Sequence, residues 1–175
     1  MSVRIEIEPL EINENSYDDV KRGDLPWPDE LIFQCNGKHI NKINGGILGG
    51  TWDVTSVIAQ ALRELIQSNK EGIIYFHDYP LEIVLEIIDR DVLRVSVKYG
   101  LPMGRTRFEP NRFIEKVSYS ELMRVAIDAI RDYNDKFERI IGDRGKQLPY
   151  SEWIQHRRTS LALLEKQYLE NHPSL

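Results

Sequence analysis

Cysteine is nearly absent from this sequence, since Cys35 is the one thiol in 175 residues. A lone cysteine has no partner within the chain, which excludes a disulfide scaffold. No stretch approaches the roughly 20 consecutive apolar residues that a membrane helix needs. The first residues, Met1 to Glu8, lack the basic head and apolar stretch of a secretory signal. We therefore expect a protein of a reducing compartment, the cytoplasm, with no membrane partner.

The usual signatures of bound metals and cofactors are missing as well. The four histidines form no His-x-x-x-His pair and Cys-x-x-Cys is absent, so the sequence predicts no metal site. The glycine-rich stretch 45–50 lacks both the Gly-Lys-Ser/Thr ending of a phosphate loop and the Gly-x-Gly-x-x-Gly spacing of a dinucleotide site. No Gly-x-Ser-x-Gly elbow marks a nucleophile. We expect no cofactor, assign no catalytic residue and favour a function other than catalysis.

An excess of basic charge, which is typical of nucleic-acid-binding proteins, is also lacking. The chain carries 28 acidic and 23 basic side chains, a net charge of −5. Residues 1–30 hold nine of the acids and three of the bases, so their net charge is −6 and the rest of the chain is nearly neutral. An acidic segment repels phosphate backbones and attracts basic surfaces. The sequence therefore predicts no nucleic-acid partner and favours a protein partner with a basic surface.

Alternation of apolar and polar residues indicates several strands. It predicts strands at 3–8, 31–35, 39–43, 73–77, 82–89 and 92–99. The pair Asn36-Gly37 favours a type I′ turn, which would join the second and third strands as a hairpin. In the last strand Arg94, Ser96 and Lys98 are expected to face outward. Residues 11–30 and 100–110 are interpreted as loops.

Apolar residues at helical spacing predict three helices. The first begins near Val54 and stops at Asn69 or Gly72. The second follows the capping-box pair Ser118 and Glu121 and runs to about residue 141. The third opens near residue 150. The stripe expected to be buried on the second helix consists of Leu122, Ala126, Ile130, Tyr133, Phe137 and Ile140.

Strands joined by tight turns favour an antiparallel sheet with helices on one side. We predict a single α+β domain over residues 1–175, with a mainly antiparallel sheet of about five to six strands and three helices packed mostly on one face. The first helix could also serve as a crossover between strands, so a mixed sheet stays open.

The acidic first thirty residues contain the leading candidate site. Trp27 lies between Pro26 and Pro28, and two prolines stiffen a loop and lower the entropy lost on binding. An exposed tryptophan is a common anchor of protein interfaces. The alternative is that Trp27 folds back over the open face of the sheet. We assign partner binding to this tryptophan and to the acids around it: Asp18, Asp19, Asp24, Trp27, Asp29 and Glu30.

Two other functions stay open. The first is a small-molecule-binding protein or small enzyme with a pocket near His77, built from His77, Asp78, Arg105 and Arg107, the last two from the basic Arg105–Arg112 loop. The second is a homo-oligomeric protein, such as a homodimer, whose sheet edge or last two helices make the contact.

The region from Leu31 to Leu65 combines an apolar hairpin around Asn36-Gly37, the run Gly49-Gly50-Thr51-Trp52-Asp53 and an amphipathic helix, with a β meander behind it. In this arrangement the chain resembles the small cytoplasmic immunity proteins that neutralise polymorphic bacterial toxins. The similarity covers about a third of the chain. It implies a bacterial, non-enzymatic protein that binds a toxin, and it assigns no role to any single residue.

Overall fold

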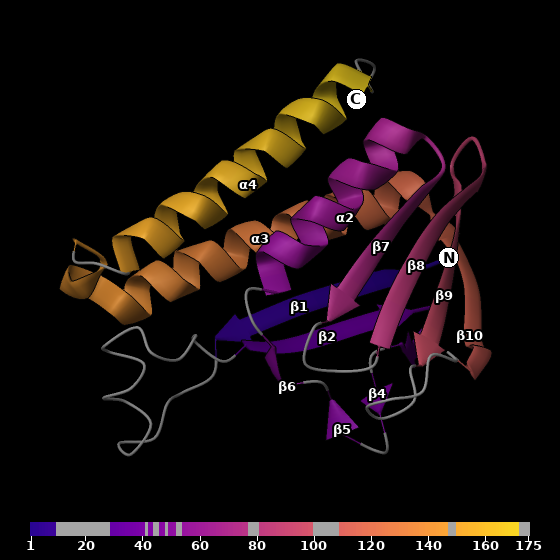
Figure 1. Ribbon diagram of the computed structural model, residues 1–175, viewed down its shortest axis with the longest axis horizontal. Coiled ribbons are helices and arrows are strands. Elements are labelled where there is room, and N and C mark those ends of the chain that lie inside the picture. The colour runs from indigo at the N-terminus through magenta and orange to yellow at the C-terminus, as the bar shows by residue number, and fades with distance from the viewer. Residues whose placement is uncertain are drawn as a thin grey trace.

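The computed structural model describes residues 1–9, 29–40, 42–43, 46–47, 49–51, 54–76, 81–99, 109–146 and 150–171, and the statements below concern these residues. They form two main sheets, a two-stranded ribbon and three α-helices. Every pairing between described strands is antiparallel. The predicted α+β class is therefore confirmed, while the strands are more numerous than expected and divide between two sheets. Figure 1 shows the helices together on one side of the strands.

The first sheet contains both ends of the acidic segment. Its strands are β1 (Val3–Pro9), β2 (Asp29–Cys35), β3 (Lys38–His39) and β6 (Gly49–Thr51), with β2 paired to each of the other three. Apolar side chains alternate along β1 and β2 and point into the core, as the period-two pattern predicts. Asn36 and Gly37 both have positive φ, 51° and 77°, which confirms the predicted hairpin turn.

Two predicted boundaries in this sheet are wrong. Asp29 and Glu30 belong to β2 and not to the loop 11–30, because they extend the ladder by pairing with Pro9 and Glu8 of β1. The return strand of the hairpin stops at His39, short of the predicted residue 43. The neighbouring segments β4 (Lys42–Ile43) and β5 (Gly46–Ile47) pair with each other as a separate ribbon.

The second, larger sheet has the order β10-β9-β8-β7. Its strands are β7 (Glu71–Phe76), β8 (Leu81–Asp89), β9 (Val92–Tyr99) and β10 (Glu109–Ser118). The sequence pattern predicts the first three and misses β10. Adjacent apolar residues, Phe113 and Ile114, break the alternation there, and the register with β9 shifts between Glu109 and Phe113.

Helix α2 (Val54–Ser68) packs directly on β7 and ends where Asn69 takes a positive φ of 49°, one of the two predicted stops. The other predicted stop, Gly72, lies within β7 and serves a different purpose. A Cβ atom at Gly72 would lie 2.2 Å from the carbonyl oxygen of Ala61, far inside van der Waals contact. The absence of a side chain at this position therefore allows α2 to approach the sheet.

The start of helix α3 (Tyr119–Ile141) is fixed by side chains from two other elements. Ser118 caps it as predicted, because its Oγ accepts from the backbone N–H of Glu121 at 3.2 Å. Asp91, in the β8–β9 turn, accepts from the Ser120 N–H and the Ser118 hydroxyl, both at 2.8 Å. The Glu121 carboxylate accepts from the Val3 N–H of β1 at 3.2 Å. This helix start therefore joins the two sheets.

The end of α3 differs from the predicted stripe by one residue. Ile140 is 47% exposed, whereas Ile141 is 3% exposed and lies in the core. Gly142, with φ of 55°, ends the helix, and its N–H donates to the Glu138 carbonyl. A short 3₁₀ turn, η1 (Gly142–Lys146), follows.

Helix α4 (Tyr150–Asn171) lies over α2 and α3 and covers them with one side. Leu164 is fully buried, and Trp153, Leu161 and Tyr168 pack against the core. Arg157 is only 5% exposed. Its guanidinium lies over the ring of Phe137 at 4.1 Å and that of Tyr133 at 5.1 Å, which places the cation on two aromatic faces.

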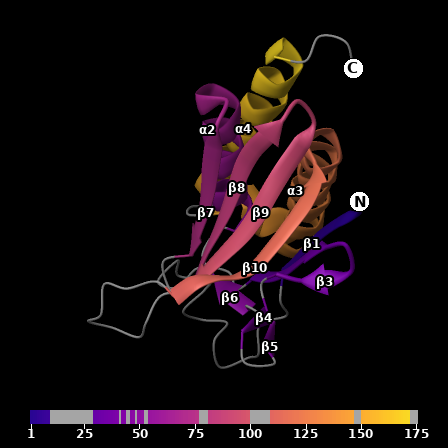
Figure 2. The same cartoon turned by 90° about the vertical axis from the view of Figure 1, so that its right-hand side faces the viewer.

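The layers leave one side of the larger sheet without a helix. Figure 2 shows β7, β8, β9 and β10 side by side in front of the three helices. The prediction that the helices pack mostly on one face is confirmed. Within the described ranges, no helix combines the length and the apolar character that a membrane span requires.

Candidate functional site

Most of the residues assigned to sites from the sequence lie outside the described residues. These are Asp18, Asp19, Asp24, Trp27, His77, Asp78, Arg105 and Arg107. Asp29 and Glu30 are described at the backbone, where they pair with β1 and β6. Partner binding by the acidic segment and a pocket near His77 therefore stay predictions. The candidate site consists of residues that the structure describes.

Part of the acidic charge at the start of the chain is neutralised within the fold. Arg4 donates to both carboxylate oxygens of Glu6, at 2.7 and 2.8 Å. This hydrogen bonding lowers the pKa of Glu6. Lys136 of α3 forms an ion pair with Glu8. Within the described part of residues 1–30, Glu6 and Glu8 are thus paired with cations of the same chain.

The side of the larger sheet that faces away from the helices presents a charged row. Glu71, Glu86, Arg94 and Lys116 are direct cross-strand neighbours on β7, β8, β9 and β10. Across the four strands the charges therefore read acid, acid, base, base. The Arg94 Nε–H donates to the Glu86 carboxylate at 3.0 Å, which ties the two central members together. Glu71, Arg94 and Lys116 are exposed, and Glu86 is half-buried.

An apolar row lies beside the charged row, two residues further along each strand. It consists of Ile73, Val84, Ser96 and Ile114, again in direct register. Its centre is shielded from solvent, because Val84 is 4% and Ser96 is 6% exposed. Its end on β10 is open, because Ile114 is 55% exposed.

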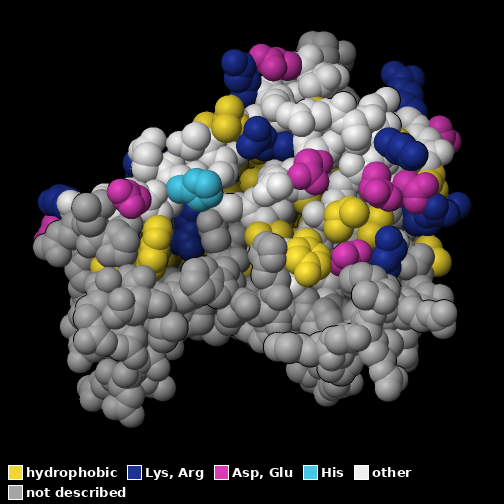
Figure 3. Space-filling model, viewed as in Figure 1, with side chains coloured by type: hydrophobic (Ala, Val, Ile, Leu, Met, Phe, Trp, Pro, Cys, Tyr) yellow, Lys and Arg dark blue, Asp and Glu magenta, His cyan; other side chains and the backbone are white. Residues whose placement is uncertain are grey.

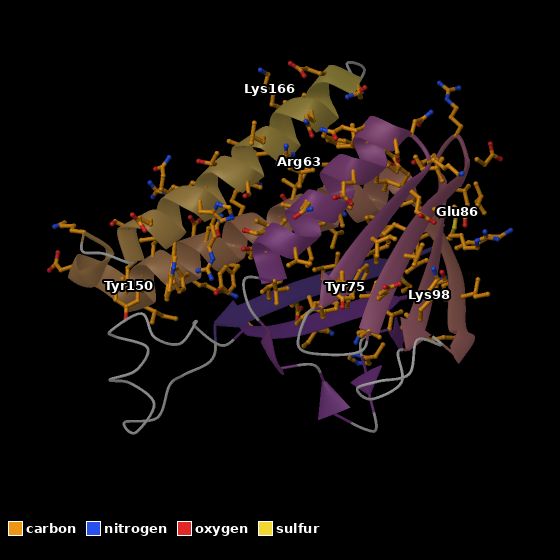
Figure 4. All side chains as sticks on the ribbon, viewed as in Figure 1. Arg63, Tyr75, Glu86, Lys98, Tyr150 and Lys166 are labelled. Carbon is orange, nitrogen blue, oxygen red and sulfur yellow. The ribbon has the colours of Figure 1, made fainter. Side chains whose placement is uncertain are left out.

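A third row completes this side of the sheet. Tyr75, Glu82 and Lys98 are neighbours on β7, β8 and β9, and Tyr75 is 42% exposed. We call the three rows together the outer face. Figure 3 shows hydrophobic side chains between acidic and basic ones over the region of β7 and β8. In Figure 4, Glu86 and Lys98 lie on the side of the sheet away from α4, which presents Lys166.

A cleft of about 620 Å³ lies at the other end of the helices, between the end of α2, the β8–β9 turn and the start of α3. Its lining mixes apolar side chains, such as Ile66 and Ile87, with polar ones that include Asp89, Arg90 and Asn171. Tyr119 lines it with a ring 6.3 Å from that of Tyr168. Burial raises the pKa of Tyr119 to about 12, so this phenol stays protonated at neutral pH. A protonated phenol donates hydrogen bonds and is a poor general base.

Cys35 is fully buried in β2, and burial raises its pKa to about 12, so it packs as a small core residue. Among the described residues, no three histidine, cysteine or carboxylate side chains gather as metal ligands would.

Comparison of the chain with known protein families, curated proteins and solved structures finds no match. The resemblance to toxin-neutralising immunity proteins accordingly stays a prediction.

The sequence predicts which side chains of a strand point outward, but it does not predict the rows that these side chains form across the sheet. The outward direction of Arg94, Ser96 and Lys98 is predicted correctly from alternation. The rows are set by the register between neighbouring strands. That register joins residues as far apart as Glu71 and Lys116, and no local pattern in the sequence specifies it.

Proposed function

We propose that the chain is a non-enzymatic protein-binding domain and that the outer face is its binding surface. The observation that carries this proposal is the exposure of Tyr75 and Ile114, 42% and 55%, on one rigid sheet face. Protein interfaces combine apolar and aromatic anchors with a polar rim. The outer face has this composition, with an apolar row flanked by two rows that carry charge.

The sheet scaffold favours binding because it is already ordered. The four strands are fixed by backbone pairing and by buried side chains on their inner side, such as Leu85 and Val95, which are fully buried. A partner that covers the outer face therefore orders only surface side chains. Such preorganisation reduces the entropic cost of association.

The charges of the outer face bear on the nature of the partner. The three rows carry three acids, Glu71, Glu82 and Glu86, and three bases, Arg94, Lys98 and Lys116. A basic partner, such as the toxin that the immunity-protein resemblance implies, would match the acidic segment of residues 1–30 better than this balanced face. Toxin binding through that segment remains a separate proposal.

Site-specific photo-crosslinking tests the proposed function. A photoreactive amino acid is placed at position 114 on the outer face or at position 163 on α4, where Leu163 is also exposed, at 39%. We expect protein adducts in cells from position 114 and few from position 163, with mass spectrometry of the adduct to identify the partner. Absence of adducts at position 114, or equal adducts at both positions, would contradict the proposal.

A further inference from the structure

The geometry of the outer face points to a second copy of this chain as its partner. We propose that two outer faces dock on each other about a two-fold axis that runs along the strands. This inference rests on the proposed protein-binding function and names the partner. It commits to a symmetric dimer in which each copy offers the same surface.

The order of charges in the charged row carries the argument. Glu71, Glu86, Arg94 and Lys116 follow one another across the sheet as two acids and then two bases. A two-fold axis along the strands reverses the order of the strands and keeps each row at its own height. β7 of one copy then lies over β10 of the other, and β8 lies over β9. Every acid of the row faces a base of the partner subunit.

The other two rows follow the same symmetry. Ile73 lies over Ile114 of the partner subunit, so the most exposed apolar side chain of the face becomes covered. Glu82 lies over Lys98 of the partner subunit, another pair of opposite charge. A two-fold axis across the strands would instead place each strand over its own copy and reverse the order of the rows. With the apolar rows opposed, Glu86 would then face Glu82 of the partner subunit and Arg94 would face Lys98 of the partner subunit, so that like charges meet. Electrostatic complementarity therefore selects the axis along the strands.

The Glu86–Arg94 pair of each copy lies beside the two-fold axis, in the charged row of the proposed dimer. Arg94 already donates to Glu86 within its own chain, and its side chain is still 45% exposed. A guanidinium has five N–H donors, so it can also reach a carboxylate opposite. Around the axis, the two Glu86 and two Arg94 side chains alternate in charge. In this arrangement each Arg94 can bind Glu86 of its own chain and Glu86 of the partner subunit at the same time.

The size of the face predicts a weak dimer. Four strands about 4.8 Å apart, with five residues of about 3.3 Å each, cover a plane of roughly 20 by 17 Å. That is less than half of the roughly 800 Å² per partner that a standard protein complex buries. We expect a dimer that dissociates on dilution and at high salt, because the exposed charges at its rim are screened.

Charge reversal tests the proposal with purified protein in sedimentation velocity experiments at low salt. The all-base variant carries Glu71→Lys and Glu86→Lys, and the all-acid variant carries Arg94→Glu and Lys116→Glu. For each variant alone we expect the dissociation constant to rise by at least about tenfold, since like charges then face each other. An equimolar mixture of the two variants should recover association, because a wholly basic row then faces a wholly acidic one.

Controls separate the dimer from a loss of folding. Circular dichroism of each variant should match that of the parent. Lys166→Glu with Glu170→Lys, an exposed pair on α4, should leave association unchanged. Self-association that is equally strong in both outer-face variants would overturn the inference, and so would a mixture that stays monomeric while the parent protein dimerises.

A cysteine pair tests the orientation of the two copies. Ile73→Cys combined with Ile114→Cys should give intermolecular disulfides under mild oxidation, whereas Ile114→Cys alone should give few. The opposite result would favour an axis across the strands. A parent protein that is monomeric at every concentration, with position 114 crosslinked to another protein, would overturn the self-docking inference and leave the proposed function standing. No crosslink at all would overturn both.

Discussion

At the scale of single residues, small side chains determine how closely the layers approach. Gly72 shows this most directly, because the carbonyl oxygen of Ala61 occupies the space where its Cβ would lie. The sequence pattern identifies Gly72 as a helix stop, since glycine is common there. Its role depends on the backbone of a different element, and no local pattern reports such a contact.

We predict that Gly72→Ala destabilises the fold by about 2–4 kcal/mol, because α2 or β7 must shift to make room for a methyl group. Urea unfolding followed by circular dichroism measures this change. The control is Glu71→Ala, one residue away and exposed, for which we expect a change within about 0.5 kcal/mol. Equal stabilities of Gly72→Ala and the parent would show that α2 does not pack on β7 this closely.

At the scale of elements, the two sheets are tied together by a few polar contacts. Glu115 of β10 forms an ion pair with Lys38 of β3 and accepts from the Asn36 side-chain amide at 2.9 Å. The same amide donates to the Lys116 carbonyl at 3.2 Å. The hairpin turn of the first sheet is thereby held against the edge strand of the second.

This tie predicts a specific pH dependence. Hydrogen bonds from Lys38 and Asn36 lower the pKa of Glu115 in the folded protein. The resulting stabilisation is present above the unfolded-state pKa of about 4.3 and is lost as the pH falls through the lower folded-state pKa. Glu115→Gln should therefore lower the free energy of unfolding at neutral pH, and the deficit should shrink below pH of about 4. Denaturant titrations at several pH values measure it.

The matched control for this experiment is Glu170→Gln, at an exposed position of α4. We expect its free energy of unfolding to follow that of the parent at every pH. A deficit in Glu115→Gln that stays constant down to pH of about 2 would contradict the assignment of the stabilisation to the charged carboxylate.

Elements also show how far sequence reasoning extends. Strands with clean alternation, such as Val92–Tyr99, and helices with a cap signal, such as Tyr119–Ile141, were predicted with nearly their observed bounds. β10 was missed because Phe113 and Ile114 stand side by side and a register shift precedes them. The strand exists because β9 offers it a partner, and pairing between distant segments is not encoded in local periodicity. The candidate face needs the same long-range register and was missed for the same reason.

At the scale of the whole molecule, one hydrophobic core joins both sheets and all three described helices. It includes Ile5 of β1, Phe33 of β2, Leu62 of α2, Leu85 of β8 and Tyr133 of α3. A core shared in this way cannot lose one sheet without exposing apolar surface of the other. The single domain predicted over residues 1–175 is in keeping with this continuity.

We predict that the chain unfolds in one cooperative transition. Far-ultraviolet circular dichroism and tryptophan fluorescence should give the same denaturation midpoint, because secondary structure and core packing are lost together. The measurement is made at low protein concentration, where the proposed weak dimer is dissociated. Two separated midpoints would show that the sheets unfold independently.

Because the thiol of Cys35 is fully buried, its rate of alkylation reports internal motion of the protein. An alkylating reagent reacts with the thiolate form of cysteine. With a pKa of about 12, the buried thiol of Cys35 contains almost no thiolate at neutral pH. Cys35 can therefore react only after β2 has separated from the core, so the labelling rate measures how often the β2–β3 hairpin opens. Since the chain has no other cysteine, every alkylated molecule records such an opening at one known position.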